Sequence, residues 1–299
     1  MKDFKHRIEF YFVTFFIILF EALPLNLAYG FSKYLGLFLY YFVPIRRTTA
    51  YFNLKRVFPN KTDAEIYKII RKMYVNFAYF FLESIIMNKL RENLDTNVEI
   101  FGLENLDAAV AKDSGVVLYT AHIGNWHIMG QRLVDAGYKI NNLVKRQRNK
   151  YVFDKEMEAM TQSGMKITIL HKTPKNIFKA LKDKDIVEFL ADQDAGDDGV
   201  FVDFFGVKAA TATGPALFSL KMAAPIVFVT DVRTDLMKHK IYIESINYES
   251  TGNLETDVYA LTQILTKKLE KYIIAHPEQY FWLHKRWLTR PKTKTKSKQ

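Results

Sequence analysis

His122 is the residue whose position best suits acid–base chemistry. It follows Val116–Thr120, a short apolar run with β-branched and aromatic members that predicts a buried strand. Gly124 and Asn125 then favour a sharp turn, and the residues from Trp126 to Val134 predict a helix. A histidine at the carboxyl end of a strand, beside a helix N-terminus, lies where open α/β sheets bind ligands, and the free N–H groups of that terminus attract anions. We therefore expect His122 to take a proton from an attacking hydroxyl.

The imidazole of His122 needs a partner that fixes its tautomer, and that partner is normally a carboxylate. The natural place for one is a helical turn further along, five residues after His122. That position holds a second histidine, His127. A neutral imidazole accepts a hydrogen bond but lacks the charge that stabilises an imidazolium, so His127 is an unusual partner.

Two further polar clusters follow predicted strands. Lys145-Arg-Gln-Arg-Asn149 comes after the strand predicted over residues 139–144, and guanidinium groups bind phosphate in a fork geometry; a solvated basic loop is the alternative. Asp192-Gln-Asp194 ends the strand predicted over residues 186–191, and its carboxylates could bind a sugar hydroxyl, orient a histidine or cap a helix. Because the carboxyl ends of parallel strands share one edge of a sheet, we expect both clusters near His122.

The elements that must position these residues are strands alternating with helices. This alternation predicts an α/β fold with a mixed, mostly parallel central sheet flanked by helices. The predicted strands cover residues 98–103, 116–120, 139–144, 165–170, 186–191, 225–231 and 240–246. The predicted helices lie between residues 48 and 94 and over 126–134, 151–162, 174–182, 213–222 and 254–275.

Residues 1–45 are more apolar and aromatic than the rest of the chain. Their first apolar run, from Phe10 to Phe20, is shorter than the roughly 20 residues that a spanning helix needs. Three interpretations stay open: a membrane anchor (one tilted span or a monotopic helix pair), a cleaved signal peptide, or a buried helical hairpin in a soluble protein. We predict the N-terminal helical membrane anchor over residues 1–45, a catalytic domain over 46–291, and a basic disordered tail over 292–299.

The charge and composition narrow the class of partner. The chain has 43 Lys and Arg against 32 Asp and Glu, a net charge of +11, which favours an anionic partner. It contains no cysteine, which excludes disulfides, thiolate metal sites and a cysteine nucleophile. The segment from Pro277 to Arg290 interleaves aromatic and basic residues, which is typical of a membrane interface and also of single-stranded nucleic-acid binding. The apolar N-terminus argues against nucleic acid.

Four blocks of the chain, in this order, resemble the lipid A biosynthesis acyltransferases, within the wider lysophospholipid acyltransferase group. The blocks are His122-Ile-Gly-Asn-Trp126, Asp192-Gln-Asp194, Phe201-Val-Asp-Phe-Phe-Gly206 with Thr211 and Thr213, and Pro277-Glu-Gln-Tyr-Phe-Trp-Leu-His284 with Arg286, Thr289, Arg290 and Pro291. The resemblance covers about residues 5–291. It implies a membrane anchor and an α/β domain at the cytoplasmic face of the bacterial inner membrane.

The resemblance also implies a reaction and its partners. A fatty acyl group would pass from acyl carrier protein, an acidic protein, to a hydroxyl of a lipid A precursor, an acylated and phosphorylated glucosamine disaccharide. No metal or other cofactor is implied, and the basic surface would also meet anionic membrane. His122 would be the general base. The residues expected to shape the turn or to bind substrate are Gly124, Asn125, Lys145, Arg146, Arg148, Asn149, Asp192, Gln193 and Asp194.

The sequence departs from the family at one important position. The family motif has Glu or Asp where this chain has His127. Three outcomes stay open: His127 replaces the carboxylate while Asp192 or Asp194 supplies the charge, the acceptor or donor is altered, or activity has been lost. An altered acceptor would be another phosphorylated lipid, such as a glycerophosphate or a phosphoinositol mannoside, and a chain without activity would be a lipid-binding protein.

Overall fold

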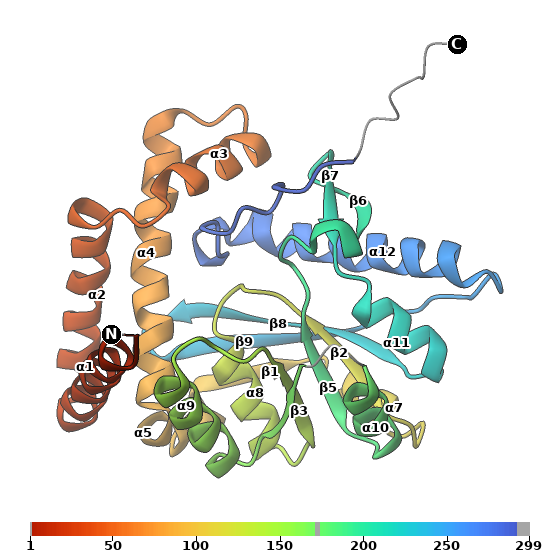
Figure 1. The fold of residues 1–299 in the computed structure, drawn as a ribbon, viewed down its shortest axis with the longest axis horizontal. Coiled ribbons are helices and arrows are strands. Elements are labelled where there is room, and N and C mark those ends of the chain that lie inside the picture. Colours follow the sequence, from red (N-terminus) through yellow and green to blue (C-terminus); the bar gives the residue numbers. More distant parts are fainter. Residues whose placement is uncertain (1, 171–173, 292–299) are drawn as a thin grey trace.

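A seven-stranded sheet forms the centre of the molecule (Figure 1). The computed structural model describes residues 2–170 and 174–291, so the tail predicted over 292–299 lies outside the described residues. The strand order is β1-β9-β8-β2-β5-β3-β4, and every neighbouring pair is parallel except β8 and β9. The predicted mixed, mostly parallel α/β sheet is therefore confirmed. The strands of this sheet are β1 (Val98–Phe101), β2 (Val116–Thr120), β3 (Ile140–Val144), β4 (Lys166–Ile169), β5 (Ile186–Leu190), β8 (Ile226–Asp235) and β9 (Lys238–Ser245).

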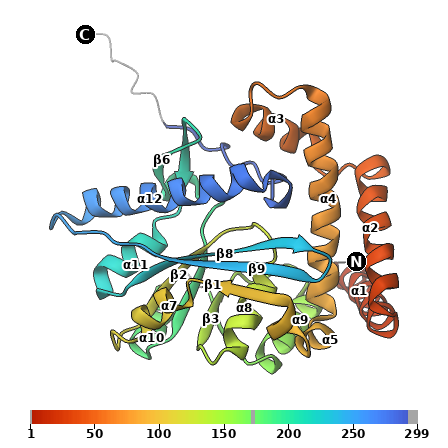
Figure 2. The same cartoon turned by 180° about the vertical axis from the view of Figure 1, so that it is seen from behind.

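Helices cover both faces of the sheet (Figures 1 and 2). Helices α11 (Gly214–Met222) and α12 (Leu254–Ala275) pack on one face, and α7 (Leu103–Val110) and α8 (Trp126–Asp135) pack on the other. Each face has its own buried apolar cluster. The remaining helices are α1 (Lys2–Ala22), α2 (Leu25–Phe42), α3 (Arg47–Val57), α4 (Asp63–Ile85), α5 (Met87–Arg91), α6 (Leu94–Asn97), α9 (Lys150–Gln162), α10 (Lys175–Lys182) and the 3-10 helices η1 (Gly196–Asp198) and η2 (Pro277–Gln279).

The structure differs from the predicted elements at three places. The short helix α7 was not predicted, and neither was the antiparallel hairpin of β6 (Val200–Phe204) and β7 (Val207–Thr211), for which only a glycine turn was expected. Strands β8 and β9 are longer than predicted. They form an antiparallel pair that reaches as far as Asp235 and Lys238, so their outer residues are paired with each other and need no apolar surroundings.

Helix α4 lies across the edge of the sheet to which β8 points (Figure 1). Its start is a capping box: the Thr62 hydroxyl accepts a hydrogen bond from the backbone N–H of Glu65, whose carboxylate accepts one from the backbone N–H of Thr62. The first half of the helix packs in one apolar cluster, through Ile66 and Ile70, and the second half packs in the other, through Leu82. Helix α4 thereby closes the side of the molecule on which the carboxyl end of β2 opens.

The N-terminal helices α1 and α2 lie outside α4 (Figures 1 and 2). They leave large apolar side chains exposed, including Phe4, Phe12 and Phe15 on α1 and Tyr34 and Phe42 on α2. Among the described residues, no helix combines the length and the apolar character that crossing a bilayer requires. The anchor predicted over residues 1–45 stays a prediction.

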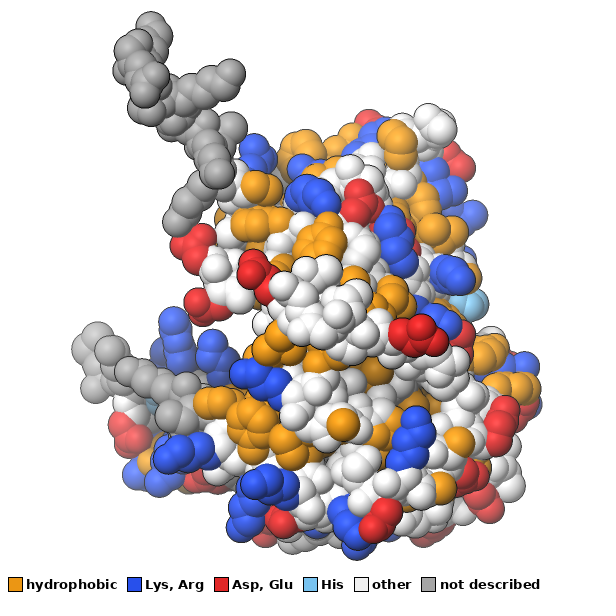
Figure 3. Space-filling view, turned by 90° about the vertical axis from the view of Figure 1, so that its right-hand side faces the viewer, with side chains coloured by type: hydrophobic (Ala, Val, Ile, Leu, Met, Phe, Trp, Pro, Cys, Tyr) orange, Lys and Arg blue, Asp and Glu red, His pale blue; other side chains and the backbone are white. Residues whose placement is uncertain are grey.

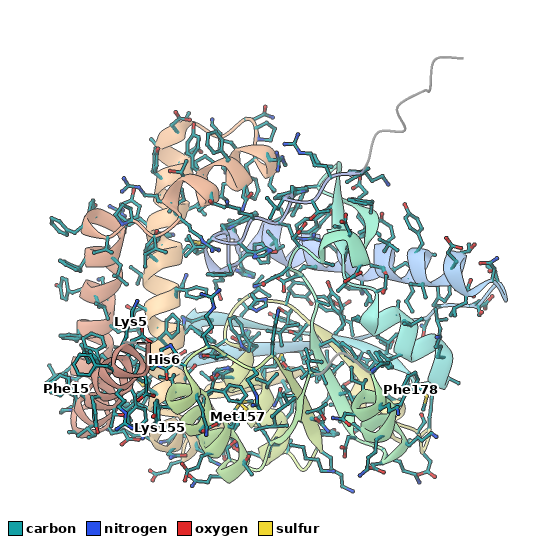
Figure 4. All side chains as sticks on the ribbon, in the orientation of Figure 1. Lys5, His6, Phe15, Lys155, Met157 and Phe178 are labelled. Carbon is teal, nitrogen blue, oxygen red and sulfur yellow. The ribbon has the colours of Figure 1, made fainter. Side chains whose placement is uncertain are left out.

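Helix α1 also contacts α9, outside the N-terminal segment 1–45. The two helices lie next to each other, and Figure 4 labels Lys5 and His6 on α1 and Lys155 and Met157 on α9. The first turns of the two helices are joined by a hydrogen bond, which the Tyr151 hydroxyl of α9 donates to the carboxylate of Asp3 on α1 at 3.0 Å.

The surface charge is not gathered in one place on the face shown in Figure 3. Lysines and arginines there are interspersed with acids and with apolar side chains. The net charge of +11 therefore does not form a single cationic patch on this face.

Candidate active site

The turn after β2 places His122 at the carboxyl edge of the sheet. Strand β2 is fully buried between β5 and β8, in keeping with its continuous apolar sequence. Gly124 has a φ of 63°, and a Cβ there would lie 2.0 Å from the carbonyl oxygen of Asp231, so only glycine fits. Asn125 caps α8, because its side-chain oxygen accepts hydrogen bonds from two backbone N–H groups of the first turn. Gly124 and Asn125 therefore shape the turn.

This cap changes the expectation of an anion site at the start of α8. The backbone N–H groups of His127 and Ile128 donate to the Asn125 side chain at 3.0 and 3.1 Å. The backbone N–H of Asn125 donates to the carboxylate of Asp231 at 2.7 Å, and that of Gly124 donates to the carbonyl of Gln279. These N–H groups are already used, so the prediction that they attract a substrate anion was wrong for them.

Asp192 is the carboxylate partner of His122. Strands β2 and β5 pair in parallel with Thr120 opposite Leu190, so the residues two positions beyond these strand ends lie near each other. Nδ1 of His122 is 2.6 Å from Oδ1 of Asp192, and the backbone N–H of His122 donates to the same oxygen at 3.2 Å. Three roles were left open for the Asp192-Gln-Asp194 block. The geometry favours one of them for Asp192, which is to orient a histidine, His122.

The hydrogen bond to Asp192 determines which nitrogen of His122 is available for chemistry. With the Nδ1 proton donated to Asp192, Nε2 carries the lone pair. Nε2 lies 3.4 Å from the side-chain amide nitrogen of Gln193. The His122 side chain is 21% exposed, whereas that of Asp192 is 2% exposed, so a substrate can reach the base but not its partner.

The two groups shift each other's pKa. Burial alone lowers the pKa of His122, but the charge of Asp192 and its hydrogen bond outweigh burial and raise this pKa above its usual 6.5. Burial alone raises the pKa of Asp192, and the charge and hydrogen bonds of His122 outweigh it, so this pKa is lowered. Asp192 is therefore ionised at neutral pH and stabilises an imidazolium.

His127 has a different environment from that expected of a carboxylate substitute. Its Nδ1 lies 2.8 Å from the hydroxyl of Ser84 on α4, and its ring lies against Phe80 and Trp126. Burial, and then the charge of His122, lower the pKa of His127 to about 4. His127 is therefore neutral at neutral pH, and the negative charge beside His122 comes from Asp192.

The basic loop after β3 lies on the same edge of the sheet. Strand order places β3 two strands from β2, a separation of about 10 Å. Lys145, Arg146 and Arg148 are exposed. Asn149 caps α9, and its side-chain nitrogen donates at 3.0 Å to the carbonyl of His6 and also at 3.0 Å to the carboxylate of Glu9. The polar atoms of Asn149 therefore serve the packing of α9 and α1.

Asp194 binds the C-terminal segment. Its carboxylate accepts hydrogen bonds from the hydroxyl of Thr289 at 2.8 Å and from the backbone N–H of Thr289 at 3.2 Å. Its own backbone N–H donates to Nε2 of His284 at 2.9 Å. The same segment reaches the catalytic turn, because the backbone N–H of Phe281 donates to the carbonyl of His122 at 2.9 Å.

The aromatic residues between Pro277 and Arg290 are buried or half-buried, which corrects their interpretation as a membrane or nucleic-acid surface, whereas Lys285 and Arg290 are exposed. Trp282, Trp287 and Arg286 are buried. Arg286 donates to the carbonyl of Ala210 at 2.7 Å and to the hydroxyl of Thr211. The alternation that resembles an interface comes from a segment whose aromatic rings pack inward and whose Arg286 guanidinium is bound to β7, although Nε of Arg286 has no hydrogen-bond partner among the described residues.

A buried charged network beneath the turn was missed by the sequence reasoning. Arg233 on β8 forms a bidentate ion pair with Glu83 on α4, and Glu83 also accepts a hydrogen bond from the side chain of Asn125 at 2.8 Å. His239 on β9 lies 2.8 Å from the carboxylate of Asp231 and has its pKa raised to about 9, because Asp231 and then Glu83 outweigh burial. The network joins α4, the turn and the β8–β9 pair.

One signal in the sequence could have found this network. Glu83 follows the strongly apolar run from Phe77 to Leu82, where an acid on a buried helical face needs a cation. The sequence does not say which cation, because Arg233 is 150 residues away along the chain.

Comparison with known proteins relates this chain to a family of enzymes. The family model described as bacterial lipid A biosynthesis acyltransferase matches residues 1–289. A lipid A biosynthesis acyltransferase of Haemophilus influenzae is 25% identical over 90% of this chain and 84% of that protein, and a lipid A biosynthesis palmitoleoyltransferase of Escherichia coli is 28% identical over 84% and 81%. A phosphatidylinositol mannoside acyltransferase of Mycobacterium tuberculosis is 28% identical over 70% of this chain, which spans only 65% of that protein's length.

Proposed function

We propose that this chain, which belongs to the bacterial lipid A biosynthesis acyltransferase family, transfers a fatty acyl group from acyl carrier protein to a hydroxyl of a lipid A precursor. The observation that carries the proposal is the 2.6 Å contact between Nδ1 of His122 and the buried carboxylate of Asp192. A base of this kind activates a hydroxyl, as acyl transfer to a sugar requires.

The proposed reaction is direct acyl transfer. Nε2 of His122 takes the proton of the acceptor hydroxyl while the hydroxyl oxygen attacks the carbonyl carbon of the acyl thioester. The tetrahedral intermediate collapses as the C–S bond breaks, and the imidazolium returns the proton to the departing thiolate. The products are an ester and a free thiol. Asp192 holds the imidazole in one tautomer and stabilises its charge throughout.

Gln193 and the basic loop have separate proposed roles. The side-chain amide of Gln193, 3.4 Å from Nε2 of His122, is placed to donate a hydrogen bond to the oxyanion of the intermediate. Lys145, Arg146 and Arg148 are exposed at the same edge of the sheet and would bind a phosphate of the acceptor. The domain over residues 46–291 would carry all of these groups.

We further propose that α1 and α2 attach the protein to the cytoplasmic face of the bacterial inner membrane as a monotopic helix pair. Their exposed side chains include Phe12, which is 64% exposed, and Phe42, which is 73% exposed. Apolar rings on a helix pair at the surface suit burial in the boundary between headgroups and acyl chains. Anionic lipid would add electrostatic attraction for a chain of net charge +11.

A phosphoinositol mannoside is the second candidate acceptor, favoured by the match to the Mycobacterium tuberculosis relative. Mass spectrometry of lipid A from cells with and without the protein tests the first candidate. We expect the lipid A of cells that contain the protein to be heavier by one acyl group. Unchanged lipid A, together with acylation of phosphoinositol mannoside in a competition assay, would replace the first candidate with the second.

A further inference from the structure

A groove with a volume of about 550 Å³ lies apart from His122, between α2, α4, the end of β8 and η2. Its inner end borders a second cavity of only about 10 Å³, which has Phe77 and Gly124 in its lining. That cavity has room for about one water molecule. The rings of Phe77 and Phe281 are stacked 4.5 Å apart, and Phe281 lies 6.2 Å from the ring of His122. Among the described residues, neither the groove nor this small cavity has His122 in its lining, so an occupant of the groove does not lie at the base.

The groove presents charges of both signs. Lys33 comes from α2 and Arg71 and Lys72 come from α4, whereas Asp235 comes from the end of β8 and Glu278 from η2. Across residues 2–170 and 174–291 the structure gives these five side chains no ion pair, either with each other or with other groups. Helices α2 and α4 thus bring three cations to the groove, and the end of β8 and η2 bring two carboxylates; Arg233 of β8 also lines the groove but is paired with Glu83.

The outer side of the groove continues into an apolar surface. Lys33 lines the groove together with Leu37 and Tyr41, at helical spacings of four residues. The next stripe of α2 consists of Tyr34, Phe38 and Phe42, which are 71%, 50% and 73% exposed. A ligand whose charged end fills the groove would therefore have an apolar surface beside it for a hydrocarbon chain.

We propose that this groove binds the zwitterionic headgroup of a membrane phospholipid, a phosphodiester that carries a primary ammonium group. The phosphate meets Lys33, Arg71 and Lys72, the ammonium meets Asp235 and Glu278, and the acyl chains leave along the exposed rings of α2. A purely anionic headgroup would leave the two carboxylates facing its negative charge. The site is independent of acyl transfer and sets which lipid the protein docks on.

The test measures binding of the full-length protein to vesicles of phosphatidylcholine alone and to vesicles of equal parts phosphatidylcholine and phosphatidylethanolamine. Both lipids are electrically neutral, so the charge of the protein does not by itself favour either vesicle. Phosphatidylcholine has no N–H group to donate to a carboxylate. The wild type should bind the mixed vesicles about tenfold more tightly, the scale of one hydrogen bond to a charged group. Equal binding to both vesicles would overturn the proposal.

Variants locate the effect in the groove. Lys33→Gln/Arg71→Gln/Lys72→Gln and, separately, Asp235→Asn/Glu278→Gln should each reduce the preference for mixed vesicles to near unity. A preference that survives in Asp235→Asn/Glu278→Gln would overturn the proposed ammonium contact, because the two lipids share the phosphate and differ only in the ammonium group. A preference that survives in both variants would overturn the groove as its origin.

Two further variants of this chain serve as a control and as a second test of the groove. The control Lys112→Gln/Lys182→Gln/Lys221→Gln removes the same charge from exposed positions on α10 and α11 and just after α7, elements that lie far from α2 in Figure 1, and should keep the preference. Leu37→Trp fills the groove without changing charge and should abolish the preference, which tests the site even if a charge variant unfolds. Because these experiments measure binding without turnover, their failure is distinguishable from failure of the proposed acyl transfer.

Discussion

The substitution Asp192→Asn tests the pairing on which the chemistry depends. Asparagine keeps the size of the side chain and can still accept a hydrogen bond from Nδ1 of His122, but it carries no charge. The imidazolium that forms when His122 takes a proton would then have no anionic partner. We expect kcat to fall steeply, because this charge matters only when the imidazolium is present.

The magnitude follows from the geometry. The nearest atoms of the pair are 2.6 Å apart, which places the centres of charge at about 4 Å. At the effective dielectric constant of about 20 that suits protein sites, two unit charges at this distance interact by about 4 kcal/mol. A loss of about 4 kcal/mol from the transition state corresponds to a decrease in kcat of about 10³-fold.

The pH dependence of kcat provides a second readout. In the wild type, kcat should rise with pH as His122 loses its proton, at a pKa above the usual 6.5. Without the charge of Asp192, burial dominates and lowers the pKa of His122, so the rise should move to lower pH while the plateau falls. Asp194→Asn is the matched control, because its carboxylate binds Thr289 and not His122. An Asp192→Asn enzyme with a kcat within tenfold of the wild type and an unmoved pH profile would refute the reasoning.

Three further predictions concern neighbouring residues. His127→Gln should lower kcat by less than about tenfold, since His127 is neutral and meets Ser84; a loss as large as that of Asp192→Asn, by the same assay, would restore His127 as the partner. Gly124→Ala should lower the free energy of unfolding in urea by about 2 kcal/mol or more, because the added Cβ meets a backbone oxygen at 2.0 Å; unchanged stability would contradict this. Glu188 is buried on β5 without a hydrogen-bond partner among the described residues, and its pKa is raised by burial to about 8, so stability present below its unfolded value of 4.5 is lost as pH rises toward 8. The gain in stability from Glu188→Met should therefore be about 3 kcal/mol larger at pH 7 than at pH 4.5, and a pH-independent change in urea unfolding would count against the raised pKa.

Local sequence patterns were enough to predict most of the fold. The apolar run Val116–Thr120 forms β2 within the predicted bounds, and α12 begins and ends where its amphipathic pattern does, at Leu254 and Ala275. The β6–β7 and β8–β9 hairpins were harder, although each joins neighbouring strands through two residues, because Phe205-Gly206 and Leu236-Met237 are not the Asn-Gly or Asp-Gly pairs that mark such a turn. Helix α7 was missed because its eight residues are too few to show a clear helical period.

The candidate site was predicted only in part, because local sequence patterns do not give the distances between residues of different strands. Placing His122 and Asp192 at strand ends was sufficient to expect them on one edge, but the parallel register that brings them within 2.6 Å is a tertiary property. The family motif suggested a partner at His127, five residues away, whereas the structure places the carboxylate 70 residues away. Burial also decided the C-terminal segment, where Trp282 and Arg286 have the sequence pattern of an interface but lie in the interior.

The most direct test of the central claim is the mass of the lipid formed by purified protein from acyl carrier protein loaded with a fatty acid and a lipid A precursor. The wild type should add one acyl group to the precursor, and His122→Ala, folded by circular dichroism and by its unfolding midpoint, should add none. Acylation by His122→Ala at the rate of the wild type would contradict the assignment of His122 as the base.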